Sequence, residues 1–365
     1  MFRRPTSIPK ITLTTLLSVA LSAITSLIGS TSLVLAQAPS AQAATADAGL
    51  FGSADPTYDG AFRQSVALLG LAAVEVPAPR PAVDWLAAQQ CLDGAFEAYR
   101  ISIRTSCRQP DVANFAGPDS NSTALAAMAL RAQGRPAEAQ RGVDALLRAQ
   151  NPDGGWGYIL TAPSEANSTG LVLSALSGVP GQRASSARQR ARAFIATQQV
   201  TCTQPGDFGL RFPPGPMANA LASGQALIGI ASRSVPFQPP ARYGSLAGTT
   251  CTSSMKAKVS AYLDQLLVRT KGRIPSSMDP ADVDWNATAS AVIGLGAAGL
   301  GRAGVKAGLA ALQGTVAEYG FAEGSPAPAA LGALRLGADI TGSDPRACGS
   351  PRTEVVASLL GSMRS

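Results

Sequence analysis

The stretch LLRAQNPDGGWGY, residues 146–158, joins a helix-like run ending at Gln150 to a break formed by Asn-Pro-Asp-Gly-Gly-Trp. Asp-Gly is a turn signal, because Gly adopts positive φ and Asp bonds to nearby main-chain groups. Shorter copies of this pattern occur as YDGAF at 58–62 and LDGAF at 92–96. A catalytic residue is needed only once, so the repetition indicates a structural joint. We assign structural roles to Gln150, Asp153 and Gly154, and we expect Trp156 to fill the seam between neighbouring helices.

Helix-like segments of two kinds alternate along the chain. Three segments are apolar nearly all round, and a more polar segment follows each. They are NSTALAAMALRAQG at 121–134, ANSTGLVLSALSG at 166–178 and WNATASAVIGLGAAG at 285–299. A helix that is apolar on every side is buried, whereas one with a polar face is solvated. Weaker copies begin near residues 61, 218 and 326, which gives six pairs in all.

Helix pairs of this kind cannot bury their apolar faces alone, so they stack on one another. The pattern predicts an all-α fold over residues 61–365, an α/α toroid of about six inner and outer helix pairs, with an open solenoid as the alternative. The final repeat carries no charged cap, which favours closure of the ring. Alternating Val, Ile and Thr, typical of strands, is absent.

The N-terminal residues indicate export. A basic start with Arg3, Arg4 and Lys10 precedes a long apolar run and then small residues spaced as Ala-x-Ala. This order is typical of a secretory signal, so we expect a signal peptide at 1–43 and a lead-in at 44–60. Cleavage after residue 36 is the alternative site, and a retained anchor is the alternative role. We expect a secreted or cell-envelope protein that meets the membrane only through an uncleaved signal segment.

The cysteines are disulfide candidates in an exported chain. Pairing of nearest neighbours would join Cys91 to Cys107 and Cys202 to Cys251, and would leave Cys348 over. The chain has no histidine, which excludes Ser-His-Asp and Cys-His catalysis and removes the commonest zinc ligand. We expect no metal site and no cofactor. The formal net charge is +7, but no Lys/Arg-dense segment has interleaved aromatics, so we expect no nucleic-acid partner.

Acidic residues precede three of the apolar segments. Asp119, Glu165 and Asp284 begin the related runs DSNSTA, EANSTG and DWNATA, in which Thr123, Thr169 and Thr288 mark equivalent positions. An acid or Asn at a helix start is a favourable cap. The functional alternative is that these residues surround one mouth of the toroid and bind a polar ligand group. The residues of that candidate binding site are Asp119, Glu165, Trp285 and Asn286.

QNPDGGWG resembles the glutamine–tryptophan repeat of the terpene cyclase and protein prenyltransferase superfamily, and QQCLDGAF at 89–96 is a weaker match. The resemblance implies an α/α toroid over about 300 residues, in which the repeat ties outer helices together and takes no part in a reaction. The prenyltransferase branch uses zinc held by Asp, Cys and His, which a chain without His does not fit. Secreted corrinoid-binding carriers are similar in export, helical toroid and disulfides.

DPADVDWNATA at 279–289 resembles the Asp-x-Asp-Asp motif that class II terpene cyclases, such as squalene–hopene cyclases, carry just before Thr-Ala. The resemblance implies that Asp282 stands at the first position and Asp284 at the middle one, which is the general acid of that family. Trp285 replaces the last Asp, and Asn286-Ala287 are extra before Thr288. A carboxylic acid that protonates an alkene must stay protonated, which neighbouring groups normally ensure.

These features predict an exported toroid that binds an apolar or isoprenoid-like small molecule, or a cell-envelope partner, without catalysis. The alternative is a class II terpene cyclase-like enzyme with Asp284 as its acid, assisted by Asp282. The chain has few aromatic residues to stabilise carbocations, which weakens that alternative. A second alternative is a carbohydrate-active α/α barrel that uses two of the acids Asp119, Glu165, Asp282 and Asp284.

Overall fold

The apolar segments form six helices around a common centre. The structure is a computed structural model that describes residues 47–365 except 201, 203–207, 214 and 343–354. The inner helices are α2 (Gly60–Ala73), α4 (Ser120–Ala132), α6 (Ala166–Ala175), α8 (Ala220–Ile230), α10 (Trp285–Ala298) and α13 (Pro328–Ile340). Every residue of α6 is buried, as expected for a helix that is apolar on all sides.

Six further helices lie outside this ring, and most of them are more polar than the inner ones. They are α3 (Arg80–Ala88), α5 (Pro136–Arg148), α7 (Gln182–Thr197), α9 (Met255–Arg269), α11 (Arg302–Gly314) and α14 (Val355–Gly361). In α5 only Ala139, Gly142, Val143, Ala145 and Leu146 are buried, so a single stripe faces inward. A one-turn helix, α12 (Val316–Tyr319), and two short antiparallel pairs complete the described elements. The pairs join β1 (Phe96–Glu97) to β2 (Pro118–Asp119), and β3 (Phe321–Ala322) to β4 (Ser325–Pro326).

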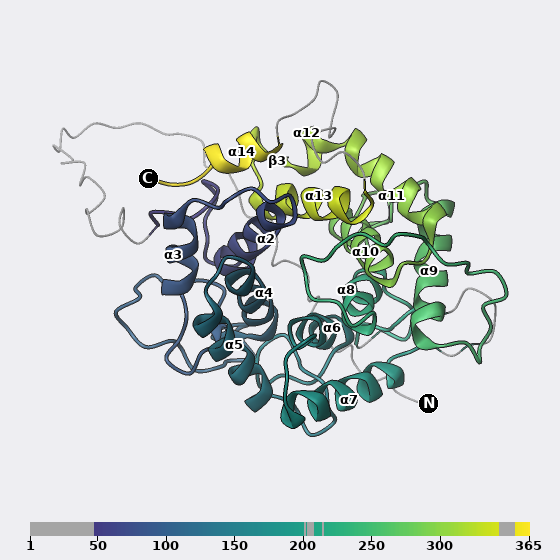
Figure 1. Cartoon of the computed structure of the whole chain (residues 1–365), viewed down its shortest axis with the longest axis horizontal. Helices are drawn as coiled ribbons and strands as arrows, with labels where there is room; N and C mark the ends of the chain where they lie inside the picture. The colour runs from purple at the N-terminus through teal and green to yellow at the C-terminus, as the bar shows by residue number, and fades with distance from the viewer. Residues whose placement is uncertain (1–46, 201, 203–207, 214, 343–354) are drawn as a thin grey trace, which may run out of the picture. The chain divides into compact units, whose positions relative to one another are not determined.

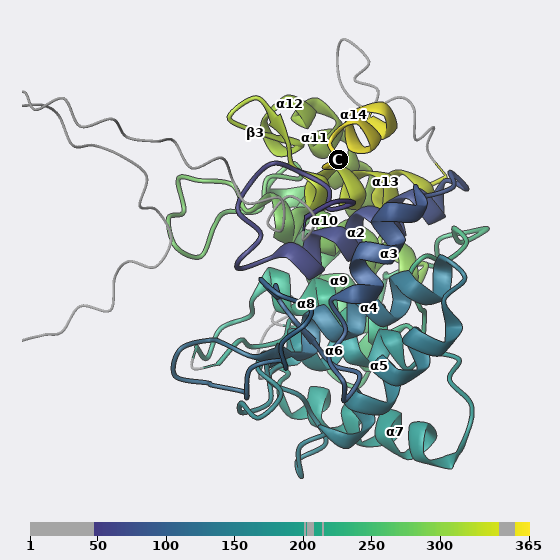
Figure 2. The same cartoon turned by 90° about the vertical axis from the view of Figure 1, so that its left-hand side faces the viewer.

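The inner helices close into a ring. Each packs against the next in the order α2, α4, α6, α8, α10, α13, and α13 packs against α2 (Figure 1). Figure 2 shows the ring from the side, with the connection between α3 and α4 projecting to the left. The predicted all-α toroid is confirmed, and the open solenoid is wrong because the last inner helix contacts the first.

The closing contact depends on two glycines. A Cβ added to Gly70 in α2 would lie 2.7 Å from the Cα of Gly332 in α13. A Cβ on Gly332 would lie 2.4 Å from the carbonyl oxygen of Val66. The two backbones therefore touch directly, and any side chain at these positions would push the ring open.

The Gln-Asp-Gly turns tie successive outer helices together. Gln150 Nε2 donates to the carbonyl oxygen of Gly154 at 2.7 Å, within its own turn. It also donates to the carbonyl oxygen of Ala187 in α7 at 2.9 Å. Trp156 is fully buried, and its Nε1 donates to Leu146 O at 2.8 Å. The stretch is thus a joint between α5 and α7.

The same joint occurs one repeat earlier. Gln90 Nε2 donates to Gly94 O at 3.0 Å and to Glu138 O in α5 at 2.8 Å. Phe96 follows the turn and is fully buried, in the place that Trp156 takes in the later copy. The repetition recognised in the sequence is therefore a repeated set of contacts.

Two disulfides join the expected neighbours. Cys91 pairs with Cys107 and Cys202 pairs with Cys251, so the nearest-neighbour pairing is confirmed. The expected signal peptide at 1–43 and Cys348 lie outside the described residues. Across the described ranges, no helix combines the length and apolar character needed to cross a bilayer.

Candidate functional site

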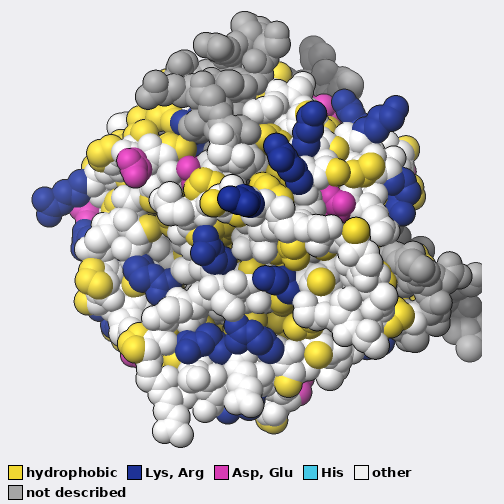
Figure 3. Space-filling model, turned by 45° about the vertical axis from the view of Figure 1, so that its right-hand side comes forward, with side chains coloured by type: hydrophobic (Ala, Val, Ile, Leu, Met, Phe, Trp, Pro, Cys, Tyr) yellow, Lys and Arg dark blue, Asp and Glu magenta, His cyan; other side chains and the backbone are white. Residues whose placement is uncertain are grey.

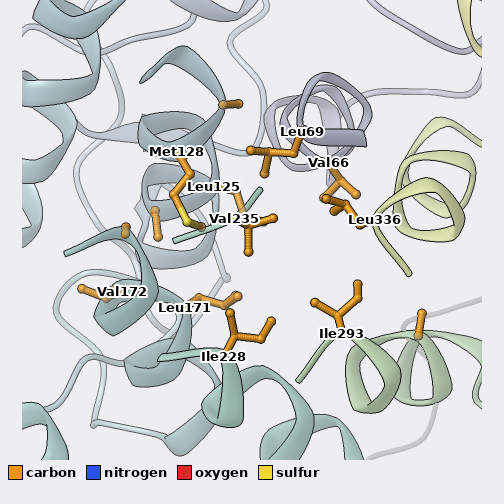
Figure 4. Packing of buried hydrophobic residues seen from close by; sticks show 14 of the residues in the cluster. Val66, Leu69, Leu125, Met128, Leu171, Val172, Ile228, Val235, Ile293 and Leu336 are labelled. Carbon is orange, nitrogen blue, oxygen red and sulfur yellow. The ribbon is translucent and has the colours of Figure 1, made fainter. Parts of the chain in front are cut away.

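The centre of the ring contains a cavity of about 450 Å³ to which all six inner helices contribute. Its wall is mainly aliphatic, and Figure 4 shows these side chains pointing toward one another from different helices. The aliphatic wall consists of Val66, Leu69, Leu125, Met128, Leu171, Ile228, Ile293 and Leu336. A wall of this kind favours an apolar molecule, because ligand pockets that are mostly hydrophobic bury most of their ligand's surface.

The end of the cavity where the inner helices terminate is narrowed by Val235, which follows α8 and is buried. Its segment is held in place on both sides. Arg131, at the end of α4, donates to Ser234 Oγ at 2.7 Å. Ser174 Oγ, in α6, donates to the carbonyl oxygen of Arg233 at 2.7 Å. These bonds fix Val235 across the base of the cavity.

The opposite end is polar. Asn121, Asn167 and Asn286 each occupy the second position of an inner helix, and all three line the cavity. The hydroxyl of Tyr319, also in the lining, donates to Asn286 Oδ1 at 3.0 Å. Side-chain amides thus form a rim at the end where the helices begin, which we call the amide rim.

Asp59 is the one carboxylate that lines the cavity among the described residues. It precedes α2, but its side chain makes no cap hydrogen bond. Arg63 approaches it at 3.2 Å, and about half of the Asp59 side chain is exposed. Burial raises the pKa of the Asp59 carboxyl above its usual value, although Arg63 opposes that shift. Sequence reasoning missed Asp59, because it lies in the YDGAF copy that was interpreted only as a turn.

The four acids predicted from the sequence lie beside the cavity rather than in its lining. Asp119 and Asp284 are N-caps: an Oδ1 atom accepts from Ser122 N at 2.6 Å and from Ala287 N at 2.8 Å, respectively. Glu165 Oε1 accepts from Ser168 Oγ at 2.6 Å. Asp282 is exposed in the preceding loop, so the structure does not combine the four acids in one cleft.

Asp119 has the most perturbed carboxyl of this group. It is buried, and its Oδ2 has no hydrogen-bond partner. Burial raises the pKa of Asp119 to about 7, despite the hydrogen bond from Ser122. The pKa of Tyr158 is also raised, first by burial and then by the charges of Asp119, Glu165 and Asp59. The charges of carboxyls from three repeats thus act on Tyr158.

Of the other two predicted binding residues, Asn286 lines the cavity and Trp285 does not. Trp285 is buried against the outside of the ring, where its Nε1 donates to Glu318 Oε1 at 3.3 Å. The guanidinium of Arg273 lies 5.5 Å from the centre of its ring. Trp285 thus packs at the start of α10 on the side away from the cavity.

Three threonines at equivalent positions make the same bond, which fixes the register between repeats. Thr123, Thr169 and Thr288 accept from the main-chain N–H of Phe96, Trp156 and Ile274, at 2.9, 2.9 and 3.4 Å. Counting back from each threonine, the amide rim residues stand two positions before it and the capping acids four positions before it. In this register Asn286 corresponds to Asn121 and Asn167, and Asp284 corresponds to Asp119 and Glu165.

This register bears on the class II motif. When Thr288-Ala289 is matched to the motif's Thr-Ala without an insertion, Asp284 takes the first position and Asn286 the middle one. An amide at the middle position cannot donate a proton to an alkene in the way a carboxylic acid does.

One group of potential metal ligands occurs among the described residues: Cys91, Glu97 and Cys107. The two sulfurs are joined as a disulfide, so neither is a thiolate ligand. Glu97 instead accepts from Arg108 Nε at 2.6 Å. The group therefore stabilises the connection between α3 and α4.

The chain is similar to known proteins in its repeats and its fold. Residues 59–163 match the family of the squalene–hopene cyclase C-terminal domain. A protein from Actinoplanes has a similar crystal structure, at 14% identity and a TM-score of 0.50, with 77% of this chain and 90% of that chain covered. The ent-copalyl diphosphate synthase from Streptomyces platensis is similar at 16% identity and a TM-score of 0.52.

The match covers 78% of this chain but 50% of the synthase, so this chain spans about half of that enzyme's length. No curated protein sequence matches the chain. The identities are low, so the solved structures establish the fold alone. The fold and the matched repeats thus support the resemblance to the terpene cyclase-like superfamily that the Gln–Trp repeat indicated.

Proposed function

We propose that this terpene cyclase-like toroid binds one apolar, isoprenoid-like molecule in its central cavity. The observation that carries the proposal is the aliphatic wall built jointly by six inner helices around a space of about 450 Å³. That volume is about 15 times the ~30 Å³ that a water molecule occupies in the liquid, so an apolar ligand of roughly 15–20 non-hydrogen atoms fits.

The two ends of the cavity set the orientation of the ligand. Val235 narrows the base, and the amide rim provides polar groups at the other end. A ligand with one polar head would place its apolar chain against the base and its head at the rim. Exposed apolar side chains near the starts of inner helices support access from the rim side. They are Tyr58, Met217 and Met278, which are 83%, 77% and 85% exposed.

Binding of alcohols of increasing chain length tests the proposal. Geraniol, farnesol and geranylgeraniol lengthen by one isoprene unit at each step, and we expect farnesol to bind best because it has roughly the number of atoms that the cavity holds. Ala333 lines the cavity, whereas Ala193 is exposed on α7. We expect Ala333→Leu to weaken farnesol binding about tenfold by overfilling the cavity, and Ala193→Leu to leave it unchanged. Equal affinity in both variants would show that the ligand binds elsewhere.

A second candidate function is cyclisation of the bound molecule, and the position of Asp59 favours it. Its carboxyl lies in the cavity lining, and burial raises its pKa, which favours the protonated form. In such a step the acid's proton would form a C–H bond with an alkene carbon, leaving a carboxylate and a carbocation. Phe62 and Tyr319 supply aromatic rings in the lining, but the nearby Arg63 favours ionised Asp59.

Turnover assays can assign the acid. We would incubate the protein with polyprenyl substrates and analyse products by gas chromatography and mass spectrometry. Loss of product in Asp59→Asn alone assigns the acid to Asp59, and loss in Asp284→Asn alone assigns it to the motif residue. Asn retains the ability to cap α10, so Asp284→Asn should remain folded. Absence of product from the unaltered protein would restrict the function to binding.

We also propose that the protein is exported. The basic and apolar N-terminal residues and the two disulfides support this proposal, since disulfides persist mainly in oxidising compartments. Fractionation of the source cells and N-terminal sequencing of the mature chain would test it. A full-length chain in the cytoplasm would contradict it.

A further inference from the structure

One part of the ring is strongly basic. Between Glu165 and Asp279 the described residues include one acid, Asp264. The same region and the adjoining α11 carry many cations on outer helices and on the segment after α8. We call the following set the basic arc: Arg183, Arg188, Arg190, Arg192, Arg233, Arg242, Lys256, Lys258, Arg302 and Lys306. Figure 3 shows Lys and Arg side chains spread over one face of the molecule, with few Asp or Glu among them.

Two contacts connect segments that carry members of the basic arc. Arg192 in α7 donates to Ser232 Oγ at 2.8 Å, which places it beside Arg233 in the segment after α8. That segment returns to the start of α11, where Gly244 N donates to Gly299 O at 2.8 Å. Arg242 and Arg302 flank this contact in sequence. These contacts link the segments that carry Arg192, Arg233, Arg242 and Arg302, from α7 to the start of α11.

Among the described residues, no ion pair joins the basic arc to an acid. Asp264 is occupied as an acceptor for Gly304 N at 2.6 Å. Burial, followed by the charge of Arg188, lowers the pKa of Arg192. Like charges are thus held close together, which an external anion would relieve.

We propose that the basic arc is a docking surface for a phosphodiester polymer that carries no bases, of the poly(glycerol phosphate) type. Seven of its ten members are Arg, whose planar guanidinium matches phosphate oxygens in pairs. Arg183, Arg242, Lys256, Arg302 and Lys306 are exposed. A row of exposed cations fits a linear polyanion, which gains affinity by releasing its counterions.

Two other anionic partners fit the surface less well. Single-stranded nucleic acid binds through aromatic side chains on which bases stack, and none of the exposed aromatics, Tyr58, Phe115 and Phe212, belongs to the segments of the basic arc. A bilayer is bound by apolar side chains inserted beside the cations. In the segments of the basic arc, the one exposed large apolar side chain of the described residues is Val268 in α9.

Binding of the full chain to poly(glycerol phosphate), followed by fluorescence anisotropy over ~50–200 mM salt, tests the proposal. The test variant combines Arg242→Gln, Lys256→Gln and Arg302→Gln, whose side chains are exposed and make no side-chain hydrogen bond among the described residues. The control combines Arg80→Gln, Arg104→Gln and Arg148→Gln, which removes the same charge from α3, the connection after it and α5. It also removes the ion pair of Arg80 with Asp84 and the hydrogen bond of Arg148 to Asp93 O. Circular dichroism and thermal unfolding show that both variants are folded.

We expect the slope of log K against log salt to fall by about 2 in the test variant, since each lost contact contributes about 0.7. The control should keep the slope and affinity of the unaltered protein. Absence of binding at ~50 mM salt, or an equal loss in the control, overturns the proposal. Binding to anionic phospholipid vesicles at the same phosphate concentration with higher affinity overturns it in favour of a membrane. At least tenfold tighter binding of a single-stranded oligonucleotide of equal charge overturns it in favour of nucleic acid.

Discussion

Thr169 of the inner helix α6 accepts a hydrogen bond from the main-chain N–H of Trp156, at 2.9 Å, across the seam between two repeats. Both residues are fully buried. The bond therefore connects the Gln-Asp-Gly turn before Trp156 to the inner ring. It also satisfies a main-chain donor that has no access to water.

Replacing Thr169 by Val tests this connection. Val has nearly the same shape but no acceptor, so the N–H of Trp156 is left unpaired in the core. We expect the free energy of unfolding to fall by about 1–3 kcal/mol in urea titrations. Thr169→Ser keeps the hydroxyl and should recover the part of the loss that is due to the hydrogen bond. A Val variant as stable as the unaltered protein would show that the bond contributes nothing net.

Substitutions at Gly154 and Gly178 distinguish the cost of backbone strain from the cost of steric overlap. Both have positive φ, 92° and 75°. A Cβ on Gly154 would lie 2.7 Å from Arg190 O, whereas a Cβ on Gly178 would meet nothing within 4 Å. We expect Gly178→Ala to cost about 1–2 kcal/mol from backbone strain alone. Gly154→Ala should cost more, because α7 must also move. Equal losses in thermal unfolding would argue against close packing at the joint.

Asp119 predicts a specific pH dependence. Its pKa is raised by burial from 3.8 to about 7 in the folded protein, so the folded state holds its proton more tightly than the unfolded state. The contribution of Asp119 to the free energy of unfolding therefore falls as pH rises from about 4 to about 7. Above pH 7 this contribution is constant. The total loss is about 4 kcal/mol at most.

Asp119→Asn removes this titration while keeping a capping side chain. We expect the variant to gain stability relative to the unaltered protein as pH rises from 5 to 8, measured by chemical denaturation at both values. A constant difference between the two proteins at both pH values would show that Asp119 does not titrate in this range.

Arg131 should control the length of ligand that the cavity accepts, if the cavity binds isoprenoid-like alcohols as proposed. Its bond to Ser234 Oγ holds the segment that carries Val235. In Arg131→Met this bond is lost, so we expect the ratio of geranylgeraniol to farnesol affinity to rise about fivefold or more. Competition binding with both alcohols measures the ratio. An unchanged ratio would mean that Val235 does not limit the chain length.

The fold was predictable because its signals are local and recur. Asp153-Gly154 and its copies mark the joints, and the apolar segments mark the inner ring. The disulfides follow the nearest-neighbour pairing, but the sequence alone did not fix which cysteines pair. Closure itself needs a contact between Gly70 and Gly332, which no local pattern reveals.

The residues that line the cavity were harder to predict from the sequence. The sequence drew attention to Asp119 and Asp284 because they begin related runs before apolar segments, yet both are used as caps. Asp59 faces the cavity only because its helix is closed against α13, a contact distant in sequence. Val235 lies in a connection without periodicity, so nothing in the sequence placed it at the base. Asn286, in contrast, was a predicted binding residue, and it lines the cavity.

Because α2 and α13 are in contact, every inner helix has an inner-helix neighbour on both sides. In a linear array the terminal units have one neighbour and fray before the middle ones. Here α2 has neighbours in α4 and α13, as every other inner helix has two. Amide hydrogens of α2 and α13 should therefore exchange with solvent as slowly as those of α6 and α8, and the ring should open in one cooperative event rather than from its ends.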